Sequence, residues 1–226
     1  MIKRTVHVIE TILLLALFQI SIFAQVNDAG CWMSVSGEKK INPVFSASLS
    51  EEIRLNENIS EAGTIFSDVE FSYKLNKLIK ISVNYRFTNK RRPDNSYDSR
   101  NRFYVDVNIK KKFSPVTILF RSRIQTQYTD YNSSPEGQVP KNYFREKLTL
   151  KYDNNKKIIP YFSYEFYYSL NNVNSNTIDN TRKYFGFEYA INRKHSFNFF
   201  YLIQSRLNVS NPQRDFVTGV GYKFNF

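Results

Sequence analysis

Apolar and polar residues alternate with a period of two along much of this chain. In residues 79–87, for example, Ile, Ile, Val, Tyr and Phe alternate with Lys, Ser, Asn and Arg. Successive side chains of a β-strand point to opposite faces, so this pattern predicts a strand with one apolar and one polar face. The same pattern predicts ten further strands, over residues 31–40 (the weakest), 45–55, 65–75, 102–110, 116–128, 142–152, 158–168, 182–190, 195–205 and 215–226.

The connections between these segments fall into two classes. Short polar turns follow the strands that end at 40, 75, 110, 152 and 190, and longer loops rich in Asn, Ser, Asp and Arg follow the others. Short periplasmic turns and longer extracellular loops are typical of outer-membrane barrels. The sequence therefore predicts an all-β fold, an antiparallel up-and-down transmembrane β-barrel of about 10–12 strands.

The first 24 residues have the features of a secretory signal peptide. Lys3 and Arg4 precede an apolar run over residues 12–22, and Ala24 stands at the expected cleavage site. The run is shorter than the roughly 20 residues that a membrane-spanning helix needs, which disfavours an anchor. Lipidation of Cys31 is a further alternative, disfavoured because Asp28 stands where a lipoprotein signal has an aliphatic residue. A single cysteine excludes an intramolecular disulfide.

The number of predicted strands conflicts with the usual even number in bacterial barrels. Ten strands within residues 44–226 would close in antiparallel fashion. Residues 25–43 then form an N-terminal segment that contains the weak first strand. Either this segment lines or plugs the lumen, or the barrel has one further strand that the pattern does not reveal. The sequence leaves these alternatives open.

Alternation does not say which face points inward, because a soluble lipocalin-like barrel would place its apolar face inside. The strand number and the aromatic residues near strand ends favour the membrane. The chain also ends in Tyr222, Phe224 and Phe226 on one face of the last strand, a pattern similar to the signal read by the outer-membrane barrel assembly machinery. These features predict an outer-membrane location, with that machinery as a partner during biogenesis.

The formal net charge of +12 invites a nucleic-acid interpretation. The positive charges are spread over most strands, however, and no nucleic-acid motif is present. A mean hydropathy of −0.46 with 16% aromatic residues is typical of a barrel with one lipid-facing and one polar face. Outer-membrane lipid and lipopolysaccharide are therefore the expected surroundings, with no prediction of oligomeric state.

Several stretches resemble a known family. They are residues 28–32 (DAGCW), 55–59 (LNENI), 84–92 (NYRFTNKRR), 148–152 (LTLKY) and 219–224 (GVGYKF). Together they resemble the predicted outer-membrane barrels called domain of unknown function 2490, which occur mainly in Bacteroidota. The resemblance covers essentially the whole mature chain and implies fold and location, but no activity.

The sequence offers little for catalysis. Outer-membrane hydrolases and acyltransferases need a base, usually histidine, and the part of the chain after the signal peptide contains only His195, at the start of a strand. No nucleophile-elbow, zinc-protease or phosphate-loop motif is present. We therefore predict no catalytic residues, no metal site and no cofactor.

The polar face carries charges of both signs, which predicts a lumen filled with cross-strand ion pairs. The cations at the centre of this prediction lie on two neighbouring strands and are Arg121, Arg123, Arg145 and Lys147. Their inward-facing acidic candidates are Glu52, Glu70, Asp106, Glu165 and Glu188. The alternative is an anion-selective constriction built from the same cations.

Two carboxylates, Glu51 and Glu146, interrupt the apolar face.

Three function classes remain. A narrow pore or structural barrel with a salt-bridged lumen is the first prediction. A surface adhesion or ligand-binding barrel acting through its extracellular loops is the alternative, and an outer-membrane enzyme is the least favoured.

Overall fold

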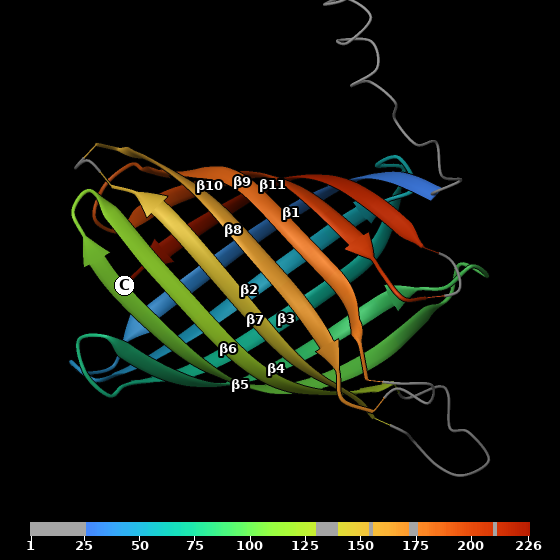
Figure 1. The fold of residues 1–226 in the computed structure, drawn as a ribbon, viewed down its shortest axis with the longest axis horizontal. Helices are drawn as coiled ribbons and strands as arrows, with labels where there is room; N and C mark the ends of the chain where they lie inside the picture. The colour runs from blue at the N-terminus through green and yellow to red at the C-terminus, as the bar shows by residue number, and fades with distance from the viewer. Residues whose placement is uncertain (1–25, 130–139, 154–155, 172–175, 210–211) are drawn as a thin grey trace, which may run out of the picture.

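The computed structural model describes residues 26–129, 140–153, 156–171, 176–209 and 212–226, and these form one closed β-barrel (Figure 1). Its strands are β1 (Val26–Lys40), β2 (Phe45–Asn56), β3 (Glu61–Lys74), β4 (Ile79–Arg91), β5 (Tyr97–Phe113), β6 (Val116–Thr129), β7 (Lys141–Tyr152), β8 (Ile158–Ser169), β9 (Ile178–Ala190), β10 (His195–Arg206) and β11 (Gln213–Asn225). Each of them overlaps a strand predicted from the period-two pattern, so the predicted fold class is confirmed. No helix of the described residues is long and apolar enough to span a membrane.

The connections define two ends of the barrel. The turn end carries connections 41–44, 75–78, 114–115, 153–157 and 191–194, and the loop end carries 57–60, 92–96, 130–140, 170–177 and 207–212. The predicted length difference holds only for the last three loops. The strands on either side of 57–60 and 92–96 extend beyond their predicted ends, because ladder pairing continues into residues whose composition indicated a loop.

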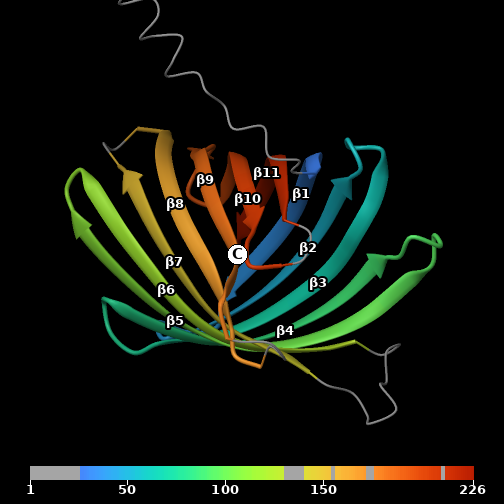
Figure 2. The ribbon, with the colours of Figure 1, turned by 45° about the vertical axis from the view of Figure 1, so that its right-hand side comes forward.

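The barrel closes through a parallel pair of strands, β1 and β11, whose register runs from Val26 opposite Gln213 to Glu38 opposite Asn225. All other neighbours are antiparallel. An up-and-down barrel with an odd number of strands must close in this way, since its first and last strands run in the same direction. Figure 2 shows β1, in blue, in the wall between β11 and β2.

This closure corrects the predicted boundary at residue 44. Residues 26–40 neither plug the lumen nor need an additional strand, because they form a full member of the wall. The start of β1 is fixed at the loop end, where the Asp28 carboxylate accepts hydrogen bonds from the backbone N–H groups of Glu57 (3.1 Å) and Asn58 (2.9 Å).

The two faces of the wall have opposite character. Outward-facing apolar side chains are exposed, with Phe71 and Val83 each at 61%. Inward-facing charged side chains are buried, with Asp106 at 3% and Glu165 at 1%. A water-soluble barrel would have the reverse arrangement, since apolar side chains leave water and charged ones stay in it. The lipocalin-like alternative is therefore wrong, and the wall has the character of a membrane barrel.

One side of the lumen has an apolar lining in which glycines make room for a ring. Phe200 lies opposite Gly186 on β9 and Gly219 on β11 in the strand register. It packs against the buried cluster of Tyr184, Leu202 and Val217. A Cβ atom on Gly219 would overlap the Phe200 ring. Glycine at this position therefore allows the ring to lie against the wall.

We expect the substitution Gly219→Ala to lower the free energy of unfolding by about 1–3 kcal/mol, because the added methyl group forces the Phe200 ring out of its packed position. Urea unfolding of the protein refolded into vesicles measures this change. Gly37→Ala is the matched control, since a Cβ there meets only the Phe226 ring, at 3.3 Å. Equal stability of Gly219→Ala and the wild type would show that the ring does not need the glycine.

Candidate functional site

Glu165 on β8 forms the centre of the charged lumen. Its Oε1 accepts hydrogen bonds from Arg145 on β7 (Nη2 at 2.6 Å, Nε at 3.1 Å) and from Nη2 of Arg121 on β6 (2.5 Å). The Glu165 side chain is 2% exposed and that of Arg145 is 6% exposed. One desolvated carboxylate thus ties together three consecutive strands.

Arg123 and Asp106 form a second buried pair beside it. Arg123 donates from Nε to Oδ1 and from Nη2 to Oδ2 of Asp106, both at 2.6 Å. These two parallel hydrogen bonds have the bidentate geometry that makes arginine–carboxylate pairs strong. The Arg123 guanidinium also lies 3.7 Å from the centre of the Tyr104 ring, so the charge is covered by both an acid and an aromatic face.

The remaining predicted luminal residues are distributed over separate contacts. Glu52 accepts a hydrogen bond from Arg54 at 2.6 Å, Glu70 from Lys80 at 2.9 Å, and Glu188 from Lys151 at 2.5 Å. Lys147 lies 4.1 Å from the centre of the Tyr184 ring. The structure therefore brings Arg121, Arg123 and Arg145 together with Asp106 and Glu165, whereas Glu52, Glu70 and Glu188 bind other cations.

Arginines and aromatic rings alternate around the lumen at this level. Arg54 lies 3.7 Å from the ring centre of Trp32 and 4.9 Å from that of Phe66, and Arg86 lies 3.7 Å from Phe66 on its other side. On one side the series continues through Tyr104 to Arg123, and on the other it continues from Trp32 to Arg182 (5.1 Å), Tyr167 and Arg145. Its two ends, Arg123 and Arg145, lie opposite each other in the strand register. We call this set the luminal belt; its members are Trp32, Arg54, Phe66, Arg86, Tyr104, Arg123, Arg145, Tyr167 and Arg182.

Several members of the belt are buried in the bore. Phe66 is 3% exposed and Tyr104 5%, and the Asp68 carboxylate accepts hydrogen bonds from Tyr104 Oη (2.5 Å) and Arg86 (2.8 and 2.5 Å). Charges removed from water in this way are stable only when they are paired. Five of the nine belt residues are buried, namely Phe66, Tyr104, Arg123, Arg145 and Tyr167, so side chains occupy much of the bore at this level.

The aromatic members of the belt were missed in the sequence. Aromatic residues were assigned to the apolar face, where girdles are expected. Strand parity carried the missing signal, because Phe66 and Tyr104 stand at positions of the same parity as Asp68 and Asp106. The position of such a residue along the strand places it on the inward face, even though its side chain is aromatic.

A polar cavity of about 820 Å³ lies between the belt and the loop end. We call it the vestibule. Trp32, Arg54, Tyr167 and Arg182 belong to both the belt and its lining. The vestibule is therefore closed on one side by the belt.

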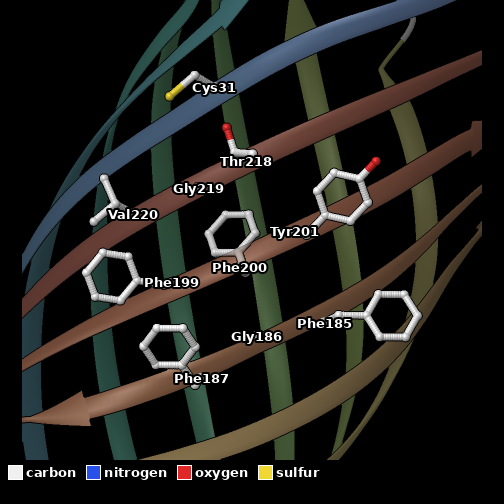
Figure 3. Close-up of a pocket in the computed structure, with 10 residues that line it drawn as sticks. All are labelled: Cys31, Phe185, Gly186, Phe187, Phe199, Phe200, Tyr201, Thr218, Gly219 and Val220. Carbon is white, nitrogen blue, oxygen red and sulfur yellow. The ribbon is translucent and has the colours of Figure 1, made fainter.

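A second cavity, of about 470 Å³, is a groove on the outward face of β9, β10 and β11 (Figure 3). Its rim consists of exposed rings, among them Phe185, Phe187, Phe199 and Tyr201. Cys31 lies at its edge as a free thiol. Because these rings share the apolar outer face of the wall, the groove has the character of a lipid contact surface.

Glu51 and Glu146 also lie on the outer face, each beside a serine on the next strand. Ser67 Oγ donates to Glu51 at 2.8 Å, and Ser122 Oγ donates to Glu146 at 2.7 Å. These hydrogen bonds satisfy part of the acceptor capacity that an apolar environment would leave without partners.

His195 is engaged at the turn end by the aromatic residues of the last strand. Its Nδ1 lies 2.5 Å from Tyr222 Oη, and its ring centre lies 4.7 Å from that of Phe224. Phe224 in turn contacts Phe226, whose backbone N–H donates to the carbonyl oxygen of Glu38 at 2.9 Å. Among the described residues, no group of three or more His, Cys, Asp and Glu side chains could hold a metal ion.

Comparisons with known proteins agree with this architecture. The family described as "Protein of unknown function (DUF2490)" matches residues 29–215. A structure titled "Bacterial polysaccharide outer membrane secretin" aligns at a TM-score of 0.53 with 12% identity, over 80% of this chain and 64% of that chain. This likeness concerns the fold alone. No curated protein matches the chain.

Two further solved barrels align less well. The NanC porin aligns at a TM-score of 0.49 with 12% identity, over 78% of this chain and 86% of that chain. The beta domain of the Bordetella autotransporter BrkA aligns at 0.48 with 9% identity, over 76% and 78% of the two chains.

We expect Arg123→Ala to lower the free energy of unfolding by roughly 3–5 kcal/mol, because the substitution leaves the Asp106 carboxylate buried without its cation. Urea unfolding in vesicles measures the loss. Lys223→Ala is the control: it removes a 2.5 Å pair with Glu38 whose lysine side chain is 47% exposed, and such pairs contribute at most about 1 kcal/mol.

A double substitution separates lost pairing from lost packing. Arg123→Met with Asp106→Leu replaces the ion pair by apolar side chains and should recover most of the stability, because no unpaired charge remains. If Arg123→Ala were no worse than Lys223→Ala, the pair would be hydrated and the lumen would be open at this level.

Proposed function

The chain belongs to the DUF2490 family of proteins of unknown function, and we propose that it is an outer-membrane β-barrel closed to ion flow, serving as a structural or ligand-binding barrel. The luminal belt is the observation that carries this proposal. A diffusion pore needs a continuous column of water, and the belt replaces that column with buried side chains.

The proposed orientation follows from the wall. Exposed apolar residues cover the outer face, as lipid contact requires. We place the turn end in the periplasm, so that the strand ends at the loop end, Thr129 and Ser169 among them, lie on the extracellular side. In this orientation β1 begins at the extracellular end.

The alternative of an anion-selective constriction is disfavoured by the pairing. Arg121, Arg123 and Arg145 already donate to Asp106 or Glu165 at 2.5–2.6 Å. A passing anion would have to displace these carboxylates from the buried cations, and this would leave the carboxylates buried without a counter-charge. We therefore propose that the ion-paired arginines in the bore stabilise the barrel and do not form a path for anions.

Ligand binding is the second candidate function, and the vestibule favours it. The vestibule is concave, lined by polar groups and of the volume range typical of ligand sites. An enzymatic role is not part of the proposal, because the contacts of His195 include no nucleophile or acid arranged as in a catalytic triad.

Purified wild-type protein should give no stable channels in planar bilayers, because the belt excludes water from the bore. Conductance steps recorded at high salt measure this directly. Heat-modifiable migration on gels serves as the control for folding. It distinguishes a folded barrel without conductance from protein that failed to fold and insert. A large, stable, anion-selective conductance would contradict the proposed closure.

The terminal residues test the proposed location. If Tyr222, Phe224 and Phe226 form an assembly signal, deletion of Phe226 should reduce the yield of folded protein in the outer-membrane fraction without changing synthesis. Leu207→Ala, an exposed change at the loop end, serves as the control. Normal insertion of the truncated chain, or recovery of the wild type in the soluble periplasm, would argue against this location.

A further inference from the structure

We infer that the vestibule binds an acidic oligosaccharide, a chain of sugars that carries carboxylate groups. This inference deepens the proposed function and rests on it, since the belt forms the inner wall of the site. Three features of the lining carry the assignment: an excess of cations, a large set of side-chain amides, and aromatic rings at the inner wall.

The lining is strongly positive. Seven lysine or arginine side chains contribute to it, against the three carboxylates of Asp28, Asp179 and Asp215. The Asp28 carboxylate is engaged by backbone N–H groups, and Asp215 accepts a hydrogen bond from Gln204 at 2.8 Å. A concave surface with an excess of positive charge focuses the electrostatic field of its cations, and it therefore attracts anions.

Five of the seven cations form no direct ion pair in the described part of the chain. Within the described part of the chain, no carboxylate lies within ion-pair distance of Lys90, Arg102, Lys141, Arg182 or Arg206. The belt below has the opposite character, because most of its arginines are paired. The charge imbalance is thus concentrated in the vestibule.

Arg102 on β5 is the most telling of these cations. It lies directly opposite Arg86 in the strand register, and Arg86 already binds Asp68. The Arg102 guanidinium donates from Nε (3.0 Å) and from Nη2 to one neutral oxygen, Oε1 of Gln127. Asp68 lies on β3, on the other side of Arg86 from Arg102, so the Arg102 charge has no carboxylate of its own and is left for an external anion.

Polar atoms of the lining also lack partners. Buried side-chain atoms of Asn56, Arg100, Asn180 and Asp215 make no hydrogen bond in the structure. Buried polar groups are otherwise nearly always hydrogen-bonded, so each such atom calls for a partner. The polar groups of this lining are therefore not all satisfied among the described residues.

The neutral lining residues indicate a sugar rather than a simple anion. Seven asparagine or glutamine side chains line the vestibule, and amides of this kind donate and accept hydrogen bonds with hydroxyl groups. Trp32, Tyr143 and Tyr167 add flat apolar faces, against which the C–H face of a sugar ring can stack. Inorganic phosphate or sulfate could accept hydrogen bonds from the cations and the amide N–H groups, but it has no ring face to stack on these aromatic side chains.

The test exploits Trp32, which lines the vestibule and is the single tryptophan of the chain. Trigalacturonate is titrated into the refolded full chain in detergent, and tryptophan fluorescence and calorimetry follow binding. We expect a saturable response that weakens with added salt, because charge pairs are screened. Maltotriose, a neutral trisaccharide, should give no saturable response, and inorganic phosphate should bind at least tenfold more weakly than trigalacturonate.

A pair of variants localises the site. Arg102→Gln should weaken trigalacturonate binding at least tenfold, whereas Arg193→Gln, the same change in charge at the turn end, should leave it unchanged. Lys90→Gln is a second vestibule variant, and it should weaken binding even if Arg102→Gln folds poorly. Equal losses in Arg193→Gln and the vestibule variants would overturn the location.

The outcomes separate this inference from the closed-barrel proposal. No saturable binding of trigalacturonate by either readout, or phosphate binding as tight as that of trigalacturonate, would overturn the saccharide assignment while the barrel stayed closed to ions. A barrel that conducts ions and still binds trigalacturonate with loss in Arg102→Gln would contradict the closure alone.

Discussion

The structure depends on pairing buried charges inside a wall whose outside is apolar. The outward side chains of a membrane barrel must suit lipid, so the polar half of every strand is forced inward. Eleven strands leave a narrow bore, and the long side chains of that polar half fill it. Glu165 illustrates the consequence: its single carboxylate accepts from Arg121 and Arg145 and is reached by almost no solvent. Stability and the proposed closure of the lumen therefore have the same origin.

The odd strand number and the belt are linked through Trp32. Parallel pairing with β11 places β1 in the wall, and its register sets Trp32 opposite Gly219 on one side and Arg54 on the other. The tryptophan then lies between Arg54 and Arg182 and connects the two halves of the arginine–aromatic series. If residues 26–40 were outside the wall, the series would be interrupted at this point. The parallel closure is thus part of what fills the lumen.

The period-two pattern predicted all eleven strands and divided their side chains into two faces, because the direction of a side chain depends on strand parity. The choice of the polar face as the inward one came from the strand number, the aromatic residues near strand ends and the last residues of the chain. It did not predict the parallel closure or the partners of each charge. Partners depend on register, barrel shear and side-chain reach, which alternation does not encode. Glu165 faces Lys147 and Arg182 in the register, yet its hydrogen bonds go to Arg121 and Arg145 diagonally across the wall. Glu70 likewise binds Lys80 rather than the central arginines.

Arginine has different surroundings in the belt and in the vestibule. Arginines at mid-height have lost their water, so each needs a carboxylate or a ring face to be stable there. Above them, Arg102 and Arg206 line a cavity in which water can solvate a charge, so an unpaired cation costs much less. In the belt below, Arg182 packs against the rings of Trp32 and Tyr167 at 5.1 and 5.0 Å. A rigid inner wall of this kind lowers the ordering cost of binding, which allows unpaired cations above it to act on an anion with little loss to reorganisation.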